Sequence, residues 1–165
     1  MRINNDLILI RHAENEINDN KPNNELLLSN QGIIQANAVS KKIYGQYDVV
    51  ISSTSLRAIL TAKIINNGID PIQDERLLER GFGSINHDGK ETDEEARNRF
   101  RLFLYEALVK YSDKRLLLVT HGGLIRLAQD VIEERLADRE PIDNCTMIKY
   151  TNGKKLILRG NWYNK

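Results

Sequence analysis

Leu7-Ile8-Leu9-Ile10-Arg11-His12-Ala13-Glu14 joins four consecutive apolar residues to a short polar group. The apolar run predicts a buried strand, and it ends on an arginine and a histidine, which are seldom buried without a purpose. The pattern returns more than a hundred residues later, where Leu116-Leu117-Leu118-Val119-Thr120 runs into His121-Gly122-Gly123. The sequence therefore predicts two strands that each deliver a histidine.

Outside these two stretches, predicted strands alternate with predicted helices. The strands are expected at 48–51, 147–150 and 155–158, and the helices at 29–44, 56–64, 92–111 and 124–134. Residues 18–24 predict a polar surface loop, 69–76 a crossing over the top of the sheet, and 77–89 an irregular loop. This order predicts a three-layer α/β/α sandwich with a mostly parallel central sheet and one antiparallel edge strand. Ligands of such sheets bind at the carboxyl ends of the strands.

Local signals support several of these boundaries. Ser29 is a candidate helix cap, and Thr92-Asp93-Glu94-Glu95 fits a capping box. Asn152-Gly153 separates the last two strands and favours a tight hairpin. These signals predict where helices begin and where the chain reverses.

Length and composition narrow the class of protein. The 165 residues are expected to form one domain, residues 1–165, with no linker. The chain has 24 Lys+Arg against 23 Asp+Glu and no lysine-rich run, so neither nucleic acid nor a membrane surface is an expected partner. No apolar run approaches the roughly 20 residues of a membrane span, and residues 1–6 lack the layout of a signal peptide. A lone Cys145 excludes an internal disulfide, so a cytoplasmic location is expected.

The residues near the two histidines indicate an anion site. Arg11 adjoins His12, and Arg57 opens the helix after the second strand. Guanidinium groups match phosphate oxygens in geometry and keep their charge. Gly122 and Gly123 leave backbone N–H groups uncovered where a helix begins, which adds donors for the same anion.

With these residues the chain resembles the histidine phosphatase (phosphoglycerate mutase-like) superfamily, in its compact phosphatase form. The opening motif of that family, Arg-His-Gly-Glu with a later Asn, corresponds to residues 11–14 and Asn18. Four further segments match in order: Leu28-Ser29 with Gly32, Gln35 and Ala36; Ser52-Ser53 with Arg57-Ala58 and Thr61-Ala62; Leu77-Leu78-Glu79 with Gly81 and Gly83; Thr120-His121-Gly122-Gly123 with Arg126. Together they span almost the whole chain.

The resemblance implies a phosphomonoester hydrolase that uses neither a metal nor another cofactor. His12 would accept the phosphoryl group of a small phosphorylated substrate, and water would hydrolyse the phosphohistidine. Glu79 would act as general acid and then as base. The residues implied to hold the phosphate are Arg11, Asn18, Arg57, His121 and Gly122. Neither the physiological substrate nor the oligomeric state follows from the sequence.

The chain also departs from the family pattern. Ala13 replaces the usual Gly, which adds a methyl group just after the proposed nucleophile, and this change is expected to be tolerated because Ala is the smallest replacement. Asn15 stands where Ser or Thr is common, residues 54–55 replace Pro-Leu, and Leu60 replaces Gln. The long insertions of the mutases are missing, which favours hydrolysis over mutase activity.

Three other readings remain open. The fold could serve as a phospho-ligand binding or scaffolding module with weak catalysis, a reading motivated by Ala13 and Asn15. It could act on protein phosphohistidine, although the branch that does so generally lacks the loop glutamate. A third reading is a zinc site built from His12, His87 and His121 with a carboxylate, which the adjacent arginines oppose.

Overall fold

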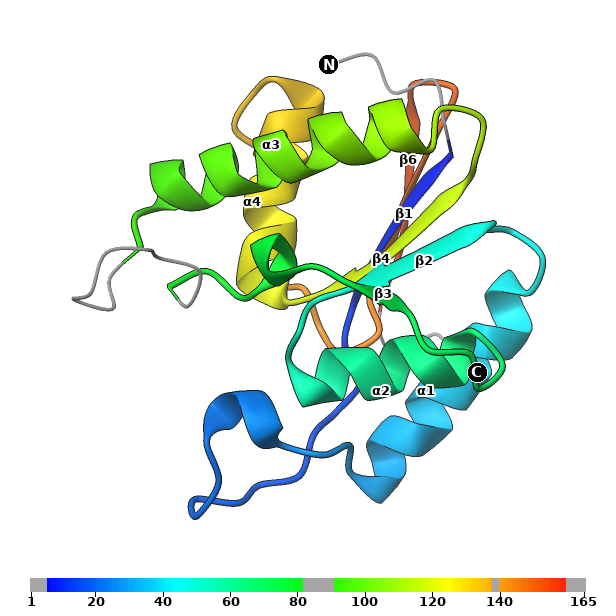
Figure 1. The fold of residues 1–165 in the computed structure, drawn as a ribbon, viewed down its shortest axis with the longest axis vertical. Coiled ribbons are helices and arrows are strands. Elements are labelled where there is room, and N and C mark those ends of the chain that lie inside the picture. The colour runs from blue at the N-terminus through cyan, green and yellow to red at the C-terminus, as the bar shows by residue number, and fades with distance from the viewer. Residues whose placement is uncertain (1–5, 82–90, 138–139, 160–165) are drawn as a thin grey trace.

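A six-stranded sheet forms the centre of the protein (Figure 1). The computed structural model describes residues 6–81, 91–137 and 140–159. Within these residues the strand order is β3-β2-β4-β1-β5-β6. The strands are β1 (Leu7–Arg11), β2 (Val49–Ser52), β3 (Ile72–Gln73), β4 (Leu116–Thr120), β5 (Met147–Thr151) and β6 (Lys154–Leu158). Strands β1 to β4 pair in parallel, and β5 runs antiparallel to both β1 and β6.

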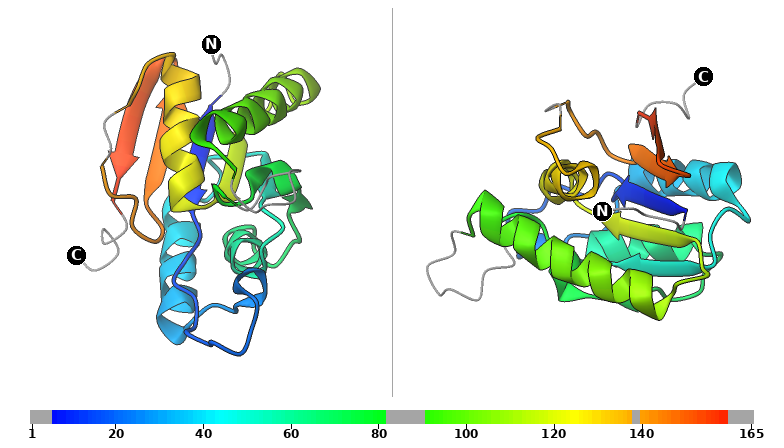
Figure 2. Two further views of the ribbon diagram at one scale, coloured as in Figure 1. Left: turned by 90° about the vertical axis from the view of Figure 1, so that its left-hand side faces the viewer. Right: turned by 90° about the horizontal axis from the view of Figure 1, so that it is seen from above.

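Two pairs of helices cover the opposite faces of the sheet, as Figures 1 and 2 show. Helices α1 (Asn30–Ile43) and α2 (Leu56–Ile65) pack on one face. Helices α3 (Asp93–Lys110) and α4 (Gly122–Glu133) pack on the other. Two short 3-10 helices, η1 (Asn23–Glu25) and η2 (Glu75–Leu77), lie in the connections. The expected α/β sandwich with a mostly parallel sheet is confirmed, and its antiparallel part comprises β5 and β6.

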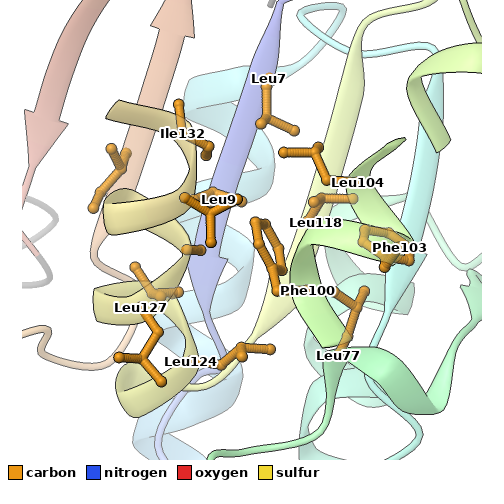
Figure 3. Close-up of a cluster of buried hydrophobic side chains, with 14 of the residues drawn as sticks. Leu7, Leu9, Leu77, Phe100, Phe103, Leu104, Leu118, Leu124, Leu127 and Ile132 are labelled. Atoms are coloured by element: carbon orange, nitrogen blue, oxygen red, sulfur yellow. The ribbon is translucent and has the colours of Figure 1, made fainter. Parts of the chain in front are cut away.

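The apolar run of β1 serves both faces of the sheet because successive side chains of a strand point to opposite sides. Leu7 and Leu9 pack with residues of α3 and α4, among them Phe100 (Figure 3). Ile8 and Ile10 pack in the cluster formed with α1 and α2. A strand buried on both faces therefore needs an unbroken apolar sequence rather than an alternating one.

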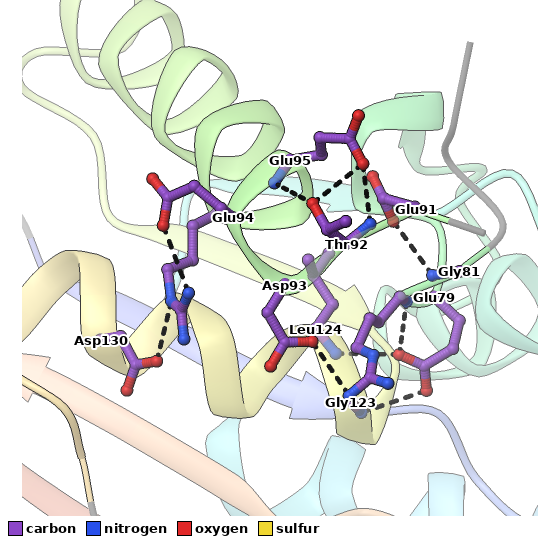
Figure 4. Close-up of polar contacts among 12 residues, drawn as sticks. Glu79, Gly81, Glu91, Thr92, Asp93, Glu94, Glu95, Gly123, Leu124 and Asp130 are labelled. Atoms are coloured by element: carbon purple, nitrogen blue, oxygen red, sulfur yellow. Dashed lines mark hydrogen bonds and ion pairs between the residues drawn. The ribbon is translucent and has the colours of Figure 1, made fainter. Parts of the chain in front are cut away.

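The predicted helix caps and the predicted hairpin are confirmed. The hydroxyl of Ser29 accepts a hydrogen bond from the Gly32 N–H at the start of α1. Thr92 and Glu95 form a reciprocal capping box at the start of α3 (Figure 4). Asn152 and Gly153 both have positive φ between β5 and β6, which a two-residue hairpin of this kind requires.

The segment predicted to cross the top of the sheet has a different structure. Ile72–Gln73 pairs in parallel with β2 and forms the edge strand β3. Two residues are too few to show an alternating pattern, so periodicity could not reveal this strand. Part of the predicted polar loop, Asn23–Glu25, forms η1. Among the helices of the described residues, none is long and apolar enough to cross a membrane.

Strand pairing brings the two histidines to the same edge of the sheet. Arg11 at the end of β1 lies opposite Thr120 at the end of β4. His12 and His121 directly follow these two strands, and the His12 N–H donates to the Thr120 carbonyl over 2.9 Å. Both side chains therefore leave the sheet at its carboxyl edge.

Candidate functional site

Two buried imidazoles form the centre of the site. The rings of His12 and His121 lie 5.1 Å apart between centroids and meet edge to face at 65°. Their exposed fractions are 4% and 0%. Burial is the largest cause that lowers the pKa of each histidine, to about 3 for His12 and to about 2 for His121. Both imidazoles are therefore neutral near pH 7.

A backbone contact fixes which nitrogen of His12 carries the proton. Its Nδ1 lies 2.8 Å from the carbonyl oxygen of Ala13, and a carbonyl can only accept. Nδ1 must then donate, which leaves a lone pair on Nε2. That lone pair accepts a hydrogen bond from Nε of Arg57 over 3.1 Å. His12 thus presents a neutral, nucleophilic nitrogen to a guanidinium group.

His121 takes the opposite tautomer. Its Nδ1 lies 3.4 Å from Nη2 of Arg57, and arginine has no acceptor, so Nδ1 accepts. Its Nε2 lies 2.8 Å from the hydroxyl of Ser53 and therefore donates to that oxygen. Besides burial, the neighbours His12 and Arg57 lower the pKa of His121. The ring is held on both sides in its neutral form.

Two arginines supply positive charge beside the imidazoles. Arg57 stands in the first turn of α2, and its Nη1 also donates to the carbonyl of Asn23. Nη1 of Arg11 donates to the carbonyl of Ile142 over 2.6 Å, and its buried Nε has no partner among the described residues. Burial lowers the pKa of both guanidinium groups, and the carboxylate of Glu79 opposes that effect. A helix N-terminus also disfavours a cation, so the pair is suited to an anionic ligand.

The carboxylate of Glu79 caps the start of α4 (Figure 4). Its Oε2 accepts from the Gly123 N–H over 3.1 Å, and its Oε1 accepts from the N–H groups of Leu124 and Arg80 over 2.9 and 2.7 Å. A Cβ on Gly123 would lie 2.6 Å from Oε1, so glycine is needed for this contact. Two residues before Glu79, the buried Thr120 hydroxyl donates to the Leu77 carbonyl over 2.6 Å, which ties the start of this loop to the end of β4.

This arrangement corrects one expectation about the anion donors. The N–H of Gly123, which was expected to be an uncovered anion donor, binds the Glu79 carboxylate instead, as does the N–H of Leu124. The reason is that the helix N-terminus attracts any nearby anion, and the Glu79 loop supplies one from within the chain. Gly122 itself lies against Arg11, since a Cβ there would be 3.5 Å from the Arg11 Cδ. The expected phosphate contact of Gly122 stays a prediction.

A cavity of about 390 Å³ opens beside these groups. It is lined by Pro22, Asn23, Asn24, Ser55, Arg57, Leu78 and Glu79. Arg57, which contacts both histidines, and Glu79, which caps α4, therefore border the same space. A ligand in this cavity would touch a cation and a carboxylate at once.

Two predicted participants are not brought into this group by the described contacts. The Oδ1 of Asn18 accepts from the Asn20 N–H over 3.1 Å, within its own loop. His87 lies outside the described residues, so the three-histidine metal arrangement stays a prediction. Within the parts of the chain that the structure describes, no group of three His, Cys, Asp or Glu side chains could hold a metal ion. Arg126 has a buried Nε without a partner among the same residues.

Several supporting side chains were not singled out from the sequence. Ser53 holds His121, and the Thr61 hydroxyl accepts from the Ala13 N–H over 3.0 Å and donates to the Arg57 carbonyl over 2.7 Å. The amide of Asn144 donates to the His12 carbonyl over 3.0 Å. Ser53 and Thr61 stand inside the motif segments and could have been found there, whereas Asn144 has no local signal.

The extra methyl group of Ala13 faces away from the site. Its side chain is fully buried in the apolar cluster with α1 and α2, beside residues such as Ala36 and Ala58. Its φ is not positive, so the backbone does not require glycine there. This packing gives a physical reason to expect that Ala is tolerated at position 13, and that expectation stays a prediction.

Comparisons with known proteins show the family and the fold of the chain. The family model described as "Histidine phosphatase superfamily (branch 1)" matches residues 7–98, more than half of the chain. A search of curated proteins gave no match. Among solved structures, a mutant phosphoserine phosphatase from Entamoeba histolytica with bound phosphoserine superimposes with a TM-score of 0.75. It is 21% identical, and the match covers 96% of this chain and 98% of that one.

A mycobacterial glucosyl-3-phosphoglycerate phosphatase in complex with VO3 gives a TM-score of 0.76 at 20% identity. The match covers 94% of this chain and 98% of that one. At 20–21% identity, the similarity of this chain to each of the two solved structures shows a shared fold.

Proposed function

Because the chain belongs to branch 1 of the histidine phosphatase superfamily, and as a member is a phosphatase, we propose that it hydrolyses phosphomonoesters through a phosphohistidine on His12. The observation that carries the proposal is the tautomer of His12. Its proton is held on Nδ1 by the Ala13 carbonyl, so Nε2 has a free electron pair at neutral pH. A nucleophile of this kind needs no base to activate it.

In the first step, Nε2 of His12 attacks the phosphorus, and the bond from phosphorus to the ester oxygen breaks. Arg57 exchanges its contact with Nε2 for contacts with the phosphoryl oxygens, joined by the unpartnered Nε of Arg11. His121 completes the group that stabilises the charge on these oxygens. Arginines and imidazole thus take the part that a metal ion plays in other phosphatases.

Glu79 gives its proton to the departing oxygen in the first step. In the second step its carboxylate takes a proton from the attacking water, the new bond from water oxygen to phosphorus forms, and the phosphorus–nitrogen bond breaks. The position of Glu79 on the cavity that Arg57 also lines supports this role. The hydrogen bond from the Gly123 N–H uses one lone pair of the Glu79 Oε2, which leaves the other lone pair of that oxygen for a proton.

The substrate class proposed is a small phosphorylated molecule. The cavity beside Arg57 and Glu79 has a size suited to such a ligand, at about 390 Å³. The structurally similar phosphatases are described with phosphoserine and with 3-phosphoglyceric acid, which are small phosphate compounds. Asn18 would join the phosphate ligands through its Nδ2 amide group, because a phosphate oxygen accepts hydrogen bonds, whereas Oδ1 already accepts from the Asn20 N–H.

A chromogenic phosphate ester tests the proposal directly. With a chelator present, 4-nitrophenyl phosphate should be hydrolysed, and acid-labile phosphate should be trapped on the protein after rapid quenching. His12→Ala should abolish both signals, while Lys149→Ala, a change at a distant ion pair with Asp6, should leave them intact. Turnover by His12→Ala, or a phosphate label on another residue, would exclude the mechanism.

A further inference from the structure

A buried ion pair lies outside the site, at the base of the loop that carries Glu79. Arg99 of α3 and Glu91 meet through two hydrogen bonds, Nε to Oε1 at 2.6 Å and Nη2 to Oε2 at 2.7 Å. Their side chains are 10% and 1% exposed. The contact is a two-pronged guanidinium–carboxylate pair, which is the most directional ion pair that side chains form.

Arg99 also binds the backbone just before Glu79. Its Nη1 donates to the carbonyl oxygens of Arg76 and Leu78, over 2.6 and 3.0 Å. All three nitrogens of the guanidinium group are therefore used, two in the ion pair and one on the main chain. Since Leu78 immediately precedes Glu79, this contact fixes the position of the backbone from which the Glu79 side chain extends.

Glu91 binds the backbone just after Glu79. Its Oε2 accepts the N–H of Gly81 over 3.0 Å (Figure 4). Residues 78–81, here called the Glu79 segment, are thus held at one end by Arg99 and at the other by Glu91. A single ion pair closes the clamp around the glutamate.

The energetics of buried ion pairs favour a positional role. Desolvation of two charges offsets most of their attraction, and apolar replacements of similar volume are often equally stable or more so. Within residues 6–81, 91–137 and 140–159, the other side-chain hydrogen bonds of this pair go to backbone at or beside the Glu79 segment. The pair therefore specifies the placement of that segment more than it adds to folding.

We propose that Arg99 and Glu91 are positioning residues that hold the Glu79 carboxyl within reach of the departing ester oxygen. The inference rests on the proposed function, in which Glu79 protonates that oxygen. An alkoxide departs poorly without a proton, whereas 4-nitrophenolate departs readily without one. Misplacement of Glu79 should therefore harm alkyl esters selectively.

Leaving-group dependence separates this role from a general loss of structure. For a two-step enzyme, kcat/KM reports the steps up to phosphoryl transfer to His12, so it isolates the proton delivered to the ester oxygen. We expect Arg99→Lys and Glu91→Asp, which keep both charges, to lower kcat/KM for glycerol 2-phosphate about 10- to 100-fold, part of what general acid catalysis supplies. With 4-nitrophenyl phosphate the same variants should change little. Glu79→Gln should show the same selectivity in stronger form.

Arg97→Lys is the matched control. Arg97 stands on the same helix and pairs with buried Asp130 over 3.0 Å, but this pair faces α4 and makes no described contact with the Glu79 segment. This control should show equal, small changes with both esters. Circular dichroism shows which variants fold. Because the two test variants alter opposite partners of the ion pair, either one tests the positioning role if the other does not fold.

Equal losses with both esters in the folded variant would overturn the inference, and so would values like those of the unaltered enzyme. Failure of the proposed function gives a different result. In that case His12→Ala would still hydrolyse both esters, or Glu79→Gln would lose activity equally with both.

Discussion

At the scale of single residues, one carbonyl group sets the chemistry of His12. The Ala13 oxygen holds the proton on Nδ1, and burial keeps the ring from gaining a second one. The cost of burying a charge thus serves the proposed nucleophile, because only the neutral ring has an electron pair to donate. The proposed mechanism requires Arg57 to move away from Nε2, since its Nε now donates to that nitrogen.

The low pKa values of the two histidines predict how stability depends on pH. Both values in the folded state, about 3 and about 2, lie below the usual value near 6.5. Between these limits the unfolded chain binds protons that the native protein does not, so the free energy of unfolding should fall as the pH falls below 6.5. Each histidine contributes a slope of about 1.4 kcal/mol per pH unit at most.

Urea denaturation at pH 7, 6 and 5 measures this slope. Most carboxylates are still ionised in that range, so the histidines dominate it. The double variant His12→Gln, His121→Gln should lose stability less steeply as the pH falls. Equal slopes for this variant and the unaltered protein would show that the two rings do not stay neutral in the native state.

At the scale of elements, the start of α1 is fitted closely against the residues after β1. The Ser29 hydroxyl caps the helix and also donates to Oε1 of Glu14 over 2.6 Å. Gln35 accepts the Glu14 N–H over 2.9 Å. The start of α1 and the chain after His12 therefore form one hydrogen-bonded unit. Gly32, in the first turn of α1, packs directly against the Glu14 backbone.

Replacement of Gly32 should destabilise the protein, although Gly→Ala inside a helix is normally favourable. A Cβ at position 32 would lie 1.9 Å from the carbonyl oxygen of Glu14, a contact that the backbone must move to relieve. We expect Gly32→Ala to lower the free energy of unfolding by about 1–3 kcal/mol, as for overpacked sites. Gln31→Ala, an exposed neighbour in the same turn, should change it little. Equal stability of the two variants in urea would contradict the close fit.

At the scale of the whole molecule, the sheet gathers one positive site from separate parts of the chain. Arg11 ends β1, Arg57 lies in the first turn of α2, and among the described residues neither forms an ion pair. Folding therefore concentrates two cations, whose charge is offset by the Glu79 carboxylate without a described ion pair. An anion that binds there should stabilise the folded state.

Inorganic phosphate should raise the melting temperature of the protein. A ligand at 100 times its Kd stabilises the native state by about 2.7 kcal/mol if it does not bind the unfolded chain. Arg57→Gln should lose this effect. Arg115→Gln, which removes an exposed arginine paired with Asp48, should keep it. Thermal scans in phosphate and in chloride of equal ionic strength provide the comparison, and equal stabilisation of both variants would place the phosphate elsewhere.

Much of the fold is readable locally. The apolar runs of β1 and β4, the Ser29 cap and the Thr92 capping box all act over a few residues, so residue order alone predicts them. The same apolar runs also placed both histidines at strand ends. By contrast, the two-residue strand β3 carries no pattern of its own and exists only because β2 offers it a free edge.

The contacts that define the site depend on distant partners. Arg57 and His12 are 45 residues apart, Gly123 and Glu79 are 44 apart, and Ser53 and His121 are 68 apart. Nothing in the sequence favours Glu79, rather than a ligand, as the anion at the start of α4. That outcome follows from the order of the strands, which sets the Glu79 loop beside α4. Residue order thus specified the strands, the caps and the two histidines because their signals are local, whereas the tautomers, the α4 cap and the Arg99–Glu91 clamp arose only when the sheet brought remote segments within hydrogen-bonding distance.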